Sequence, residues 1–242
     1  MKWTCGRRCA HFPNTTAVAY LQTDLFDSRG FLAIDKSDHG NGIEVAILSF
    51  RGSVSLRNWV ANLWSAQTDS IWNKFDKDMR IHSGFHLAYI FIREKLNKEL
   101  QKLYQNYKFS KLLVTGHSQG GVLAVLAAVD ILENLHPNYK VEVITIGQPR
   151  IGNSAFSSYV NHLFIKNDAT LIRVTNSNDL IPHLPLSLWG FQHHSNEIWC
   201  NSKSGMSTDV SVEDPECSLS SRSFSIIPHL HLWDVVFGPL CV

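Results

Sequence analysis

Residues 111–132 constrain the fold of this chain most, because three structural signals follow one another there without a break. Residues 111–115 form a short apolar segment, and residues 120–132 form a nearly all-apolar, alanine-rich segment of helical length. Between them stands Gly116-His117-Ser118-Gln119-Gly120. A strand that turns directly into a helix brings the residues flanking the turn tip into contact, so glycine is required there on steric grounds. The segment predicts a strand, a sharp turn with Ser118 at its tip, and a helix.

Strand and helix signals alternate along the rest of the chain. Runs of apolar, β-branched and aromatic residues predict strands at residues 17–21, 30–34, 43–50, 141–146 and 171–175. Apolar residues at intervals of three and four predict helices at residues 85–107 and 156–165. This alternation indicates an α/β fold whose central, mostly parallel sheet has helices on its faces. Because the chain has 242 residues and no Pro/Gly/Ser-rich linker, we expect one domain spanning residues 1–242.

Composition excludes several classes of protein. The 22 basic and 21 acidic residues leave a net charge of +1, so a nucleic-acid partner is not expected. The longest apolar run, residues 122–129, is shorter than the roughly 18 residues that span a bilayer, so no transmembrane segment is expected. There is no CxxC pair and no Cys/His cluster with zinc spacing, so we expect no metal and no other cofactor.

The five cysteines bear on the compartment in which the protein works. Cys5 and Cys241 stand near the two chain ends, and this placement suggests a disulfide that ties the ends together. Disulfides favour a secreted protein, although residues 1–8 contain no apolar signal-peptide core. The alternative of five reduced thiols in a cytosolic protein stays open.

Ser118 can act as a nucleophile only if a base and an orienting carboxylate accompany it. In folds with such a turn the acid and then the histidine follow the serine along the chain. Asp179 stands directly after the predicted strand 171–175, where an orienting acid belongs, and its alternative role is to cap a turn. The histidines that follow it, and could supply the base, are His183, His193, His194, His229 and His231.

Six blocks of residues resemble the class 3, or fungal-type, lipase family, in the family's order. They are Ile47-Leu48-Ser49-Phe50-Arg51-Gly52-Ser53, Asn58-Trp59, His82-Ser83-Gly84-Phe85, residues 116–121, Gly147-Gln148-Pro149-Arg150-Ile151-Gly152-Asn153, and Asn178-Asp179-Leu180-Ile181-Pro182-His183-Leu184-Pro185. The resemblance implies an α/β-hydrolase fold, in which a central mostly parallel sheet is flanked by helices and carries a short helical lid.

The resemblance also implies roles for individual residues. It supports Asp179 as the acid and favours His231 as the base, because Leu232 and Trp233 follow it; His229 is the alternative. It implies an oxyanion hole built from Ser53 and the backbone N–H of Gln119.

The resemblance supports the terminal bridge between Cys5 and Cys241. It leaves Cys200 and Cys217 as a second candidate pair.

A candidate lid lies between Ser53 and Ser65. Its apolar residues fall on one face of a predicted helix and include Leu56, Trp59, Val60 and Leu63. The segment is similar to the family's lid, which could cover Ser118 in water and turn its apolar face to lipid. Alternatively, the helix is permanently docked, because ordinary burial explains the same periodicity.

The expected function is that of a serine carboxylic ester hydrolase, most simply a triacylglycerol lipase working through an acyl-enzyme. Its partners would be a lipid ester substrate and a lipid–water interface, and we expect a secreted monomer. The alternatives are an esterase for short or aromatic esters, a phospholipase A1-type enzyme, and a catalytically silent lipid-binding protein.

Overall fold

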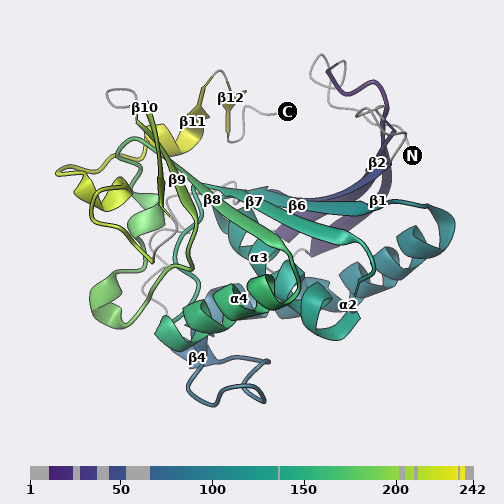
Figure 1. The fold of residues 1–242 in the computed structure, drawn as a ribbon, viewed down its shortest axis with the longest axis horizontal. Helices are drawn as coiled ribbons and strands as arrows, with labels where there is room; N and C mark the ends of the chain where they lie inside the picture. The colour runs from purple at the N-terminus through teal and green to yellow at the C-terminus, as the bar shows by residue number, and fades with distance from the viewer. Residues whose placement is uncertain are drawn as a thin grey trace.

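The computed structural model describes residues 11–23, 28–36, 44–52, 66–135, 137–201, 205–209, 212–233 and 235–237. Its centre is an eight-stranded sheet in the order β1-β2-β3-β6-β7-β8-β9-β10 (Figure 1). The strands are β1 (Thr15–Thr23), β2 (Ser28–Asp35), β3 (Val45–Phe50), β6 (Lys111–His117), β7 (Lys140–Ile146), β8 (Thr170–Asn176), β9 (Glu197–Asn201) and β10 (Gly205–Asp209).

The middle of the sheet is parallel, as the alternation of strands and helices predicts. β3, β6, β7, β8 and β9 pair in parallel, whereas β1, β2 and β3 pair antiparallel and β10 runs antiparallel to β9. The carboxyl ends of the parallel strands therefore lie along one edge, where a site is expected. All of the predicted strands are confirmed within a few residues, but the sequence pattern does not predict β9 and β10.

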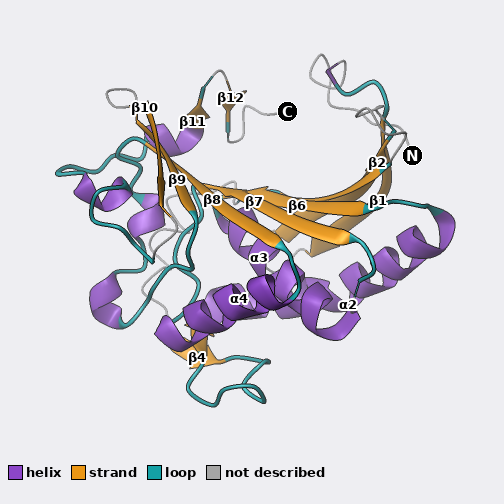
Figure 2. Ribbon diagram, viewed as in Figure 1, coloured by secondary structure: helices purple, strands orange, loops and turns teal. Residues whose placement is uncertain are grey.

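Three long helices cover one face of the sheet (Figures 1 and 2): α2 (Ser83–Asn106), α3 (Gln119–Asp130) and α4 (Ser154–Lys166). Side chains cap two of them, because His82 Nδ1 accepts the N–H of Phe85 and Asn153 Oδ1 accepts the N–H of Phe156. No helix among the described residues is long and apolar enough to cross a membrane.

Shorter elements surround the sheet. Two small antiparallel pairs are β4 (Gln67–Asp69) with β5 (Arg80–His82), and β11 (His231–Leu232) with β12 (Val235–Val236). A π-helical turn, η2 (Ile131–Leu135), continues α3, and the 3-10 turns are η3 (Ile181–His183), η4 (Ser187–Trp189), η5 (Ser218–Ser220) and η6 (Pro228–Leu230). Leu232 and Phe237 pack in a cluster with Val174, and β11 and β12 lie on the side of the sheet opposite the three long helices (Figure 1).

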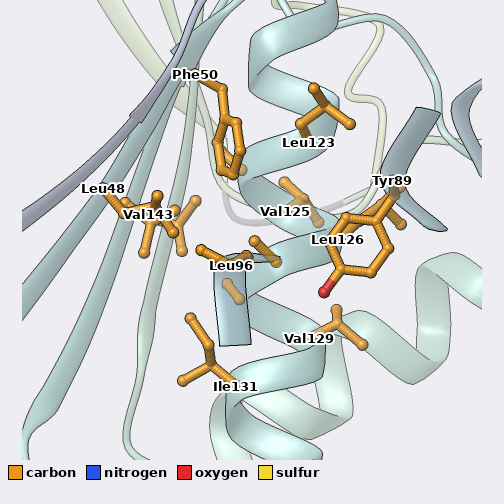
Figure 3. Packing of buried hydrophobic residues seen from close by; sticks show 14 of the residues in the cluster. Leu48, Phe50, Tyr89, Leu96, Leu123, Val125, Leu126, Val129, Ile131 and Val143 are labelled. Carbon is orange, nitrogen blue, oxygen red and sulfur yellow. The ribbon is translucent and has the colours of Figure 1, made fainter. Parts of the chain in front are cut away.

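The main core lies between the sheet and the helices, and α3 runs through it. Every residue of α3 is buried, which explains why its sequence is apolar on all sides. Figure 3 shows side chains of α2, α3, β3 and β7 converging there. The helix ends at Asp130, a buried carboxylate that accepts hydrogen bonds from Arg93 at 2.7 Å and Tyr89 at 2.8 Å. Although burial raises the pKa of Asp130, these hydrogen bonds lower it below its usual value.

The predicted bridge between Cys200 and Cys217 is wrong. Both residues are buried, but Cys200 is a free thiol. It lies on β9 and packs with Val174 and Leu232 on the sheet face opposite the helices, in a cluster to which Cys217 does not belong. Burial raises the pKa of the Cys200 thiol. Cys5 and Cys241 lie outside the described residues.

A core substitution tests this packing. Leu126→Ala in α3 removes a fully buried side chain, so we expect the free energy of unfolding to fall by about 2–5 kcal/mol. Ile165→Ala, at an α4 residue that is 81% exposed, is the matched control and should change it by less than about 0.5 kcal/mol. Urea unfolding of both variants provides the comparison, and equal losses would contradict the core described here.

Three histidines are buried in a polar network with two arginines. Burial, Arg150 and Arg173 lower the pKa of His183 to about 4. Burial and Arg173 lower the pKa of His194 to about 3, and burial with the same two arginines lowers the pKa of His193 well below its usual value. All three imidazoles are therefore neutral in the folded protein at neutral pH.

The contacts of His194 show how one of these neutral rings is held. Its Nδ1 lies 3.2 Å from the carbonyl oxygen of Ser195, and its Nε2 lies 3.2 Å from the side-chain nitrogen of Gln148. The tautomer that satisfies both contacts carries its proton on Nδ1 and accepts from Gln148 at Nε2.

This network predicts instability in acid. An unfolded histidine binds a proton below about pH 6.5, whereas folded His183 does so only near pH 4 and folded His194 only near pH 3. The free energy of unfolding should therefore fall as the pH drops through that window. His194→Gln removes one such group. Within the window, the free energy of unfolding of this variant should therefore fall by about 1.4 kcal/mol less per pH unit than that of the unchanged protein. Urea unfolding between about pH 7 and pH 4.5 measures the two slopes; identical slopes would refute the assignment.

Candidate active site

Ser118 lies at the tip of the turn between β6 and α3. Its backbone has φ 57° and ψ −127°, a conformation that residues with a side chain rarely adopt. A Cβ atom on Gly116 would lie 2.2 Å from the carbonyl oxygen of Gly120, and one on Gly120 would lie 2.3 Å from that of Phe50. The predicted strand, turn and helix are confirmed, and so is the steric reason for Gly116. Gly120 is required for a different reason, because its Cβ would collide with the backbone at the end of β3.

The surrounding backbone holds this turn in place. The N–H of Ser118 donates to the carbonyl oxygen of Ile146 on β7 at 2.9 Å, and the N–H of Gly121 donates to that of Ser118 at 2.9 Å. The Ser118 hydroxyl is buried and has no hydrogen-bond partner among the described residues. A buried hydroxyl at a strained turn is a group positioned for chemistry.

Asp179 follows β8 in the loop where the sequence predicts an orienting acid. Its Oδ1 accepts the N–H of Ile181 at 2.9 Å, and its Oδ2 lies 2.8 Å from Nδ1 of His229. Both carboxylate oxygens therefore have partners, and both side chains are buried. The carboxylate holds the proton of the neutral imidazole on Nδ1, which leaves Nε2 as the basic atom.

His229 is fixed by its close neighbours. A Cβ atom on Gly147, which follows β7, would lie 2.8 Å from two atoms of the His229 ring and 3.2 Å from Oδ2 of Asp179. Glycine is thus required at position 147, because a side chain there would collide with His229 and Asp179. Nε2 of His229 is buried and, like the Ser118 hydroxyl, has no partner in the part of the chain that the structure describes.

The preference for His231 over His229 is wrong. His231 is exposed and begins β11, in which the next residue, Leu232, points inward. Its carbonyl oxygen accepts a hydrogen bond from the Asn176 side chain, but its ring does not reach Asp179, whose second oxygen is taken by His229. The aromatic residue that favours His231 in the sequence, Trp233, is 72% exposed at a hairpin tip.

His117 is a site residue that the sequence reasoning missed. Its Nε2–H donates to the carbonyl oxygen of His229 at 2.8 Å, and the two ring centres are 4.4 Å apart. Phe237 stacks on the same ring at 4.3 Å. Burial and the neighbouring His229 lower the pKa of His117 to about 3, so it is a neutral donor. Its place directly before Ser118 at the end of β6 was the signal available in the sequence.

The remaining predicted site residues are placed only in part. Gln119 is buried. Because it is the first residue of α3, its backbone N–H lies at the positive end of the helix. Ser53 and the candidate lid residues Leu56, Trp59, Val60 and Leu63 lie outside the described residues. Among the described residues there is no group of three or more His, Cys, Asp or Glu arranged to hold a metal ion.

The arrangement can perform one kind of chemistry well. A serine hydroxyl, a histidine oriented by a carboxylate and a helix start are the groups that acyl transfer requires. The hydrogen bond from His117 to the carbonyl oxygen of His229 holds the backbone of His229 next to the residue that precedes Ser118.

Comparison with known proteins agrees with this geometry. Residues 47–189 match the family model described as Lipase (class 3). A lipase from Rhizomucor miehei is 29% identical, with 99% of this chain and 64% of that protein covered, so the chain spans less than two thirds of its length. A secreted mono- and diacylglycerol lipase A from Penicillium cyclopium is also 29% identical, with 90% of this chain and 70% of that protein covered.

A solved structure extends the likeness to the fold. It is a triacylglycerol lipase whose catalytic centre is described as a serine protease triad, and it is 28% identical to this chain with a TM-score of 0.83. The match covers all of this chain and 88% of that one. Since the family model spans more than half of the sequence and the sheet, turn and helices agree, the chain belongs to the class 3 lipase family and has the α/β-hydrolase fold.

Proposed function

We propose that the protein is a serine carboxylic ester hydrolase that acts as a triacylglycerol lipase, with Ser118, His229 and Asp179 as its triad. The observation that carries the proposal is the hydrogen bond between Asp179 and His229, two residues 50 positions apart in the sequence. It holds an imidazole beside the strand end from which Ser118 projects. Membership of the lipase family supports the same reaction.

In the first step, Nε2 of His229 takes the proton from the Ser118 hydroxyl as the oxygen attacks the ester carbonyl. Asp179 stabilises the imidazolium that forms, through the hydrogen bond to Nδ1. The negative charge on the carbonyl oxygen would be stabilised by the N–H of Gln119 and by Ser53. The imidazolium then protonates the alcohol, which leaves, and the acyl group remains on Ser118.

In the second step, His229 removes a proton from water, and the resulting nucleophile attacks the acyl-enzyme. The bond between Ser118 and the acyl carbon breaks, the serine oxygen recovers its proton from His229, and a carboxylic acid is released. Neither of these two proposed steps uses a metal or a cofactor. The neutral state of His117 matters here, because a charged neighbour would oppose protonation of His229.

The exposed surface beside His229 supports a lipid as the substrate. Ile227, two residues before the base, is 67% exposed, and Trp233, four residues after it, is 72% exposed. Exposed apolar side chains near the base in the sequence suit contact with a lipid–water interface better than contact with a water-soluble ester. The names of the relatives, a lipase and a secreted mono- and diacylglycerol lipase, support an extracellular lipase, and we propose that it works as a monomer.

Removal of the nucleophile tests the reaction. Ser118→Ala should reduce ester hydrolysis on the order of 10⁴-fold or more, because no other group can form the acyl-enzyme. Ser110→Ala, at an exposed serine just before the other end of β6, is the matched control and should keep full activity. Initial rates on emulsified tributyrin measure both, and an active Ser118→Ala protein would sink the proposal.

Two histidine variants test the assignment of the base. His229→Gln should lower kcat on the order of 10³-fold or more, since it removes the atom that accepts the serine proton. His231→Gln should change kcat less than about threefold, because the His231 ring is exposed and makes no contact with Asp179. If steady-state kinetics showed the larger loss of kcat in His231→Gln, the base would be His231 and not His229.

The competing functions are separated by substrate and by labelling. An esterase would prefer soluble short-chain or aromatic esters, a phospholipase A1-type enzyme would prefer a phospholipid, and a triacylglycerol lipase should hydrolyse emulsified triolein. A catalytically silent lipid-binding protein would not react with a fluorophosphonate, whereas the proposed enzyme should be labelled at Ser118 and lose the label in Ser118→Ala.

A further inference from the structure

The chain enters the sheet through an exposed β-turn at residues 12–15. The N–H of Thr15 donates to the carbonyl oxygen of Phe12 at 3.2 Å, with Pro13 and Asn14 at the two central positions. Proline presets the backbone of the first central position, and asparagine suits the second. The carbonyl oxygen of Asn14 accepts the N–H of Lys36 at 3.1 Å, so the turn is held against the end of β2 while the Asn14 residue stays exposed.

Asn14, Thr15 and Thr16 form the acceptor pattern for N-linked glycosylation, in which a hydroxyl residue stands two positions after an asparagine. No other asparagine of the 242-residue sequence has Ser or Thr at that position. The strand alternation places the pattern favourably, because Thr15 points into the protein and Thr16 points to solvent. The two side chains that the modification needs, those of Asn14 and Thr16, are both exposed.

An exposed aromatic ring stands next to this acceptor. Phe12 is 56% exposed, and it makes no aromatic ring contact in the part of the chain that the structure describes. Residues two apart in a chain have Cα atoms within about 7 Å of each other. A sugar attached to Nδ2 of Asn14 can therefore reach the Phe12 ring, whose apolar face suits the C–H face of a sugar.

We propose that Asn14 carries an N-linked oligosaccharide whose first N-acetylglucosamine packs on Phe12. The donor is an oligosaccharide linked to a polyprenyl pyrophosphate. Nδ2 of Asn14 forms a bond to C1 of the first sugar and gives up a proton, while the bond from C1 to the pyrophosphate oxygen breaks and the lipid pyrophosphate leaves. The proposal rests on passage through a secretory pathway and not on the triad, so the two can fail separately.

The position of the glycan gives it a further consequence. β1 is an edge strand of the eight-stranded sheet, and Asn14 directly precedes its first residue. Unpaired edge strands are templates for pairing between chains, and natural proteins protect them with bulky or charged groups. A hydrated oligosaccharide at this end of β1 would hinder that pairing.

Secretion from yeast behind a cleavable leader tests the modification. Intact mass spectrometry should show one added oligosaccharide, which endoglycosidase H trims to a single N-acetylglucosamine. Asn14→Gln and Thr16→Ala should each remove it, whereas Thr15→Val, which keeps the acceptor pattern and a buried side chain of similar size, should retain it. A secreted protein with the bare polypeptide mass, or a glycan that survives Asn14→Gln, overturns the proposal.

A double-mutant cycle tests the contact with Phe12. Phe12→Ala should lower the Tm of the trimmed, single-sugar protein by about 2–4 °C, because it removes the ring beneath the sugar. In the Asn14→Gln background, which carries no sugar, the same substitution should change the Tm by less than about 1 °C. Equal shifts in the two backgrounds would show that the sugar does not pack on Phe12.

Discussion

The contact between the backbone of Gly116 and that of Gly120 is the constraint on which the rest of the site depends. Because a Cβ atom on either glycine would collide with a neighbouring backbone, the end of β6 can pass directly into α3. This close approach forces Ser118 into its strained conformation and starts a helix at the carboxyl edge of the sheet. It also drives α3 through the middle of the core, so the apolar character of the whole helix is a consequence of the turn that precedes it.

The other two members of the proposed triad are placed in different ways. Asp179 comes soon after β8 and its Oδ1 accepts the N–H of Ile181, so much of its placement is local, and a backbone bridge to Ser225 adds to it. His229 instead depends on three separate elements: His117 at the end of β6, Gly147 after β7, and Asp179 after β8.

This difference explains how much the sequence could predict. The strands of the parallel sheet, the turn at Ser118 and the position of Asp179 follow from patterns within short windows, and they were predicted. The base was not, because His229 and His231 are each followed by leucine and only a contact 50 residues away separates them. β9 was missed for a related reason: its Glu197 is buried only because Thr175 and Arg173 on β8 meet it. Ser53 and the lid stay predictions.

The histidines near the site differ chiefly in the charge of their neighbours. Burial opposes protonation of His117, His183, His193 and His194 and lowers the pKa of each. Arg173 adds to this effect at the last three rings, and His229 adds to it at His117. Among these buried rings His229 alone has a carboxylate at hydrogen-bond distance among the described residues. The fold therefore keeps several imidazoles neutral and gives one of them the negative partner that an imidazolium needs. That partner is what distinguishes a base from a buried histidine, and it cannot be read from the residues beside His229 in the sequence.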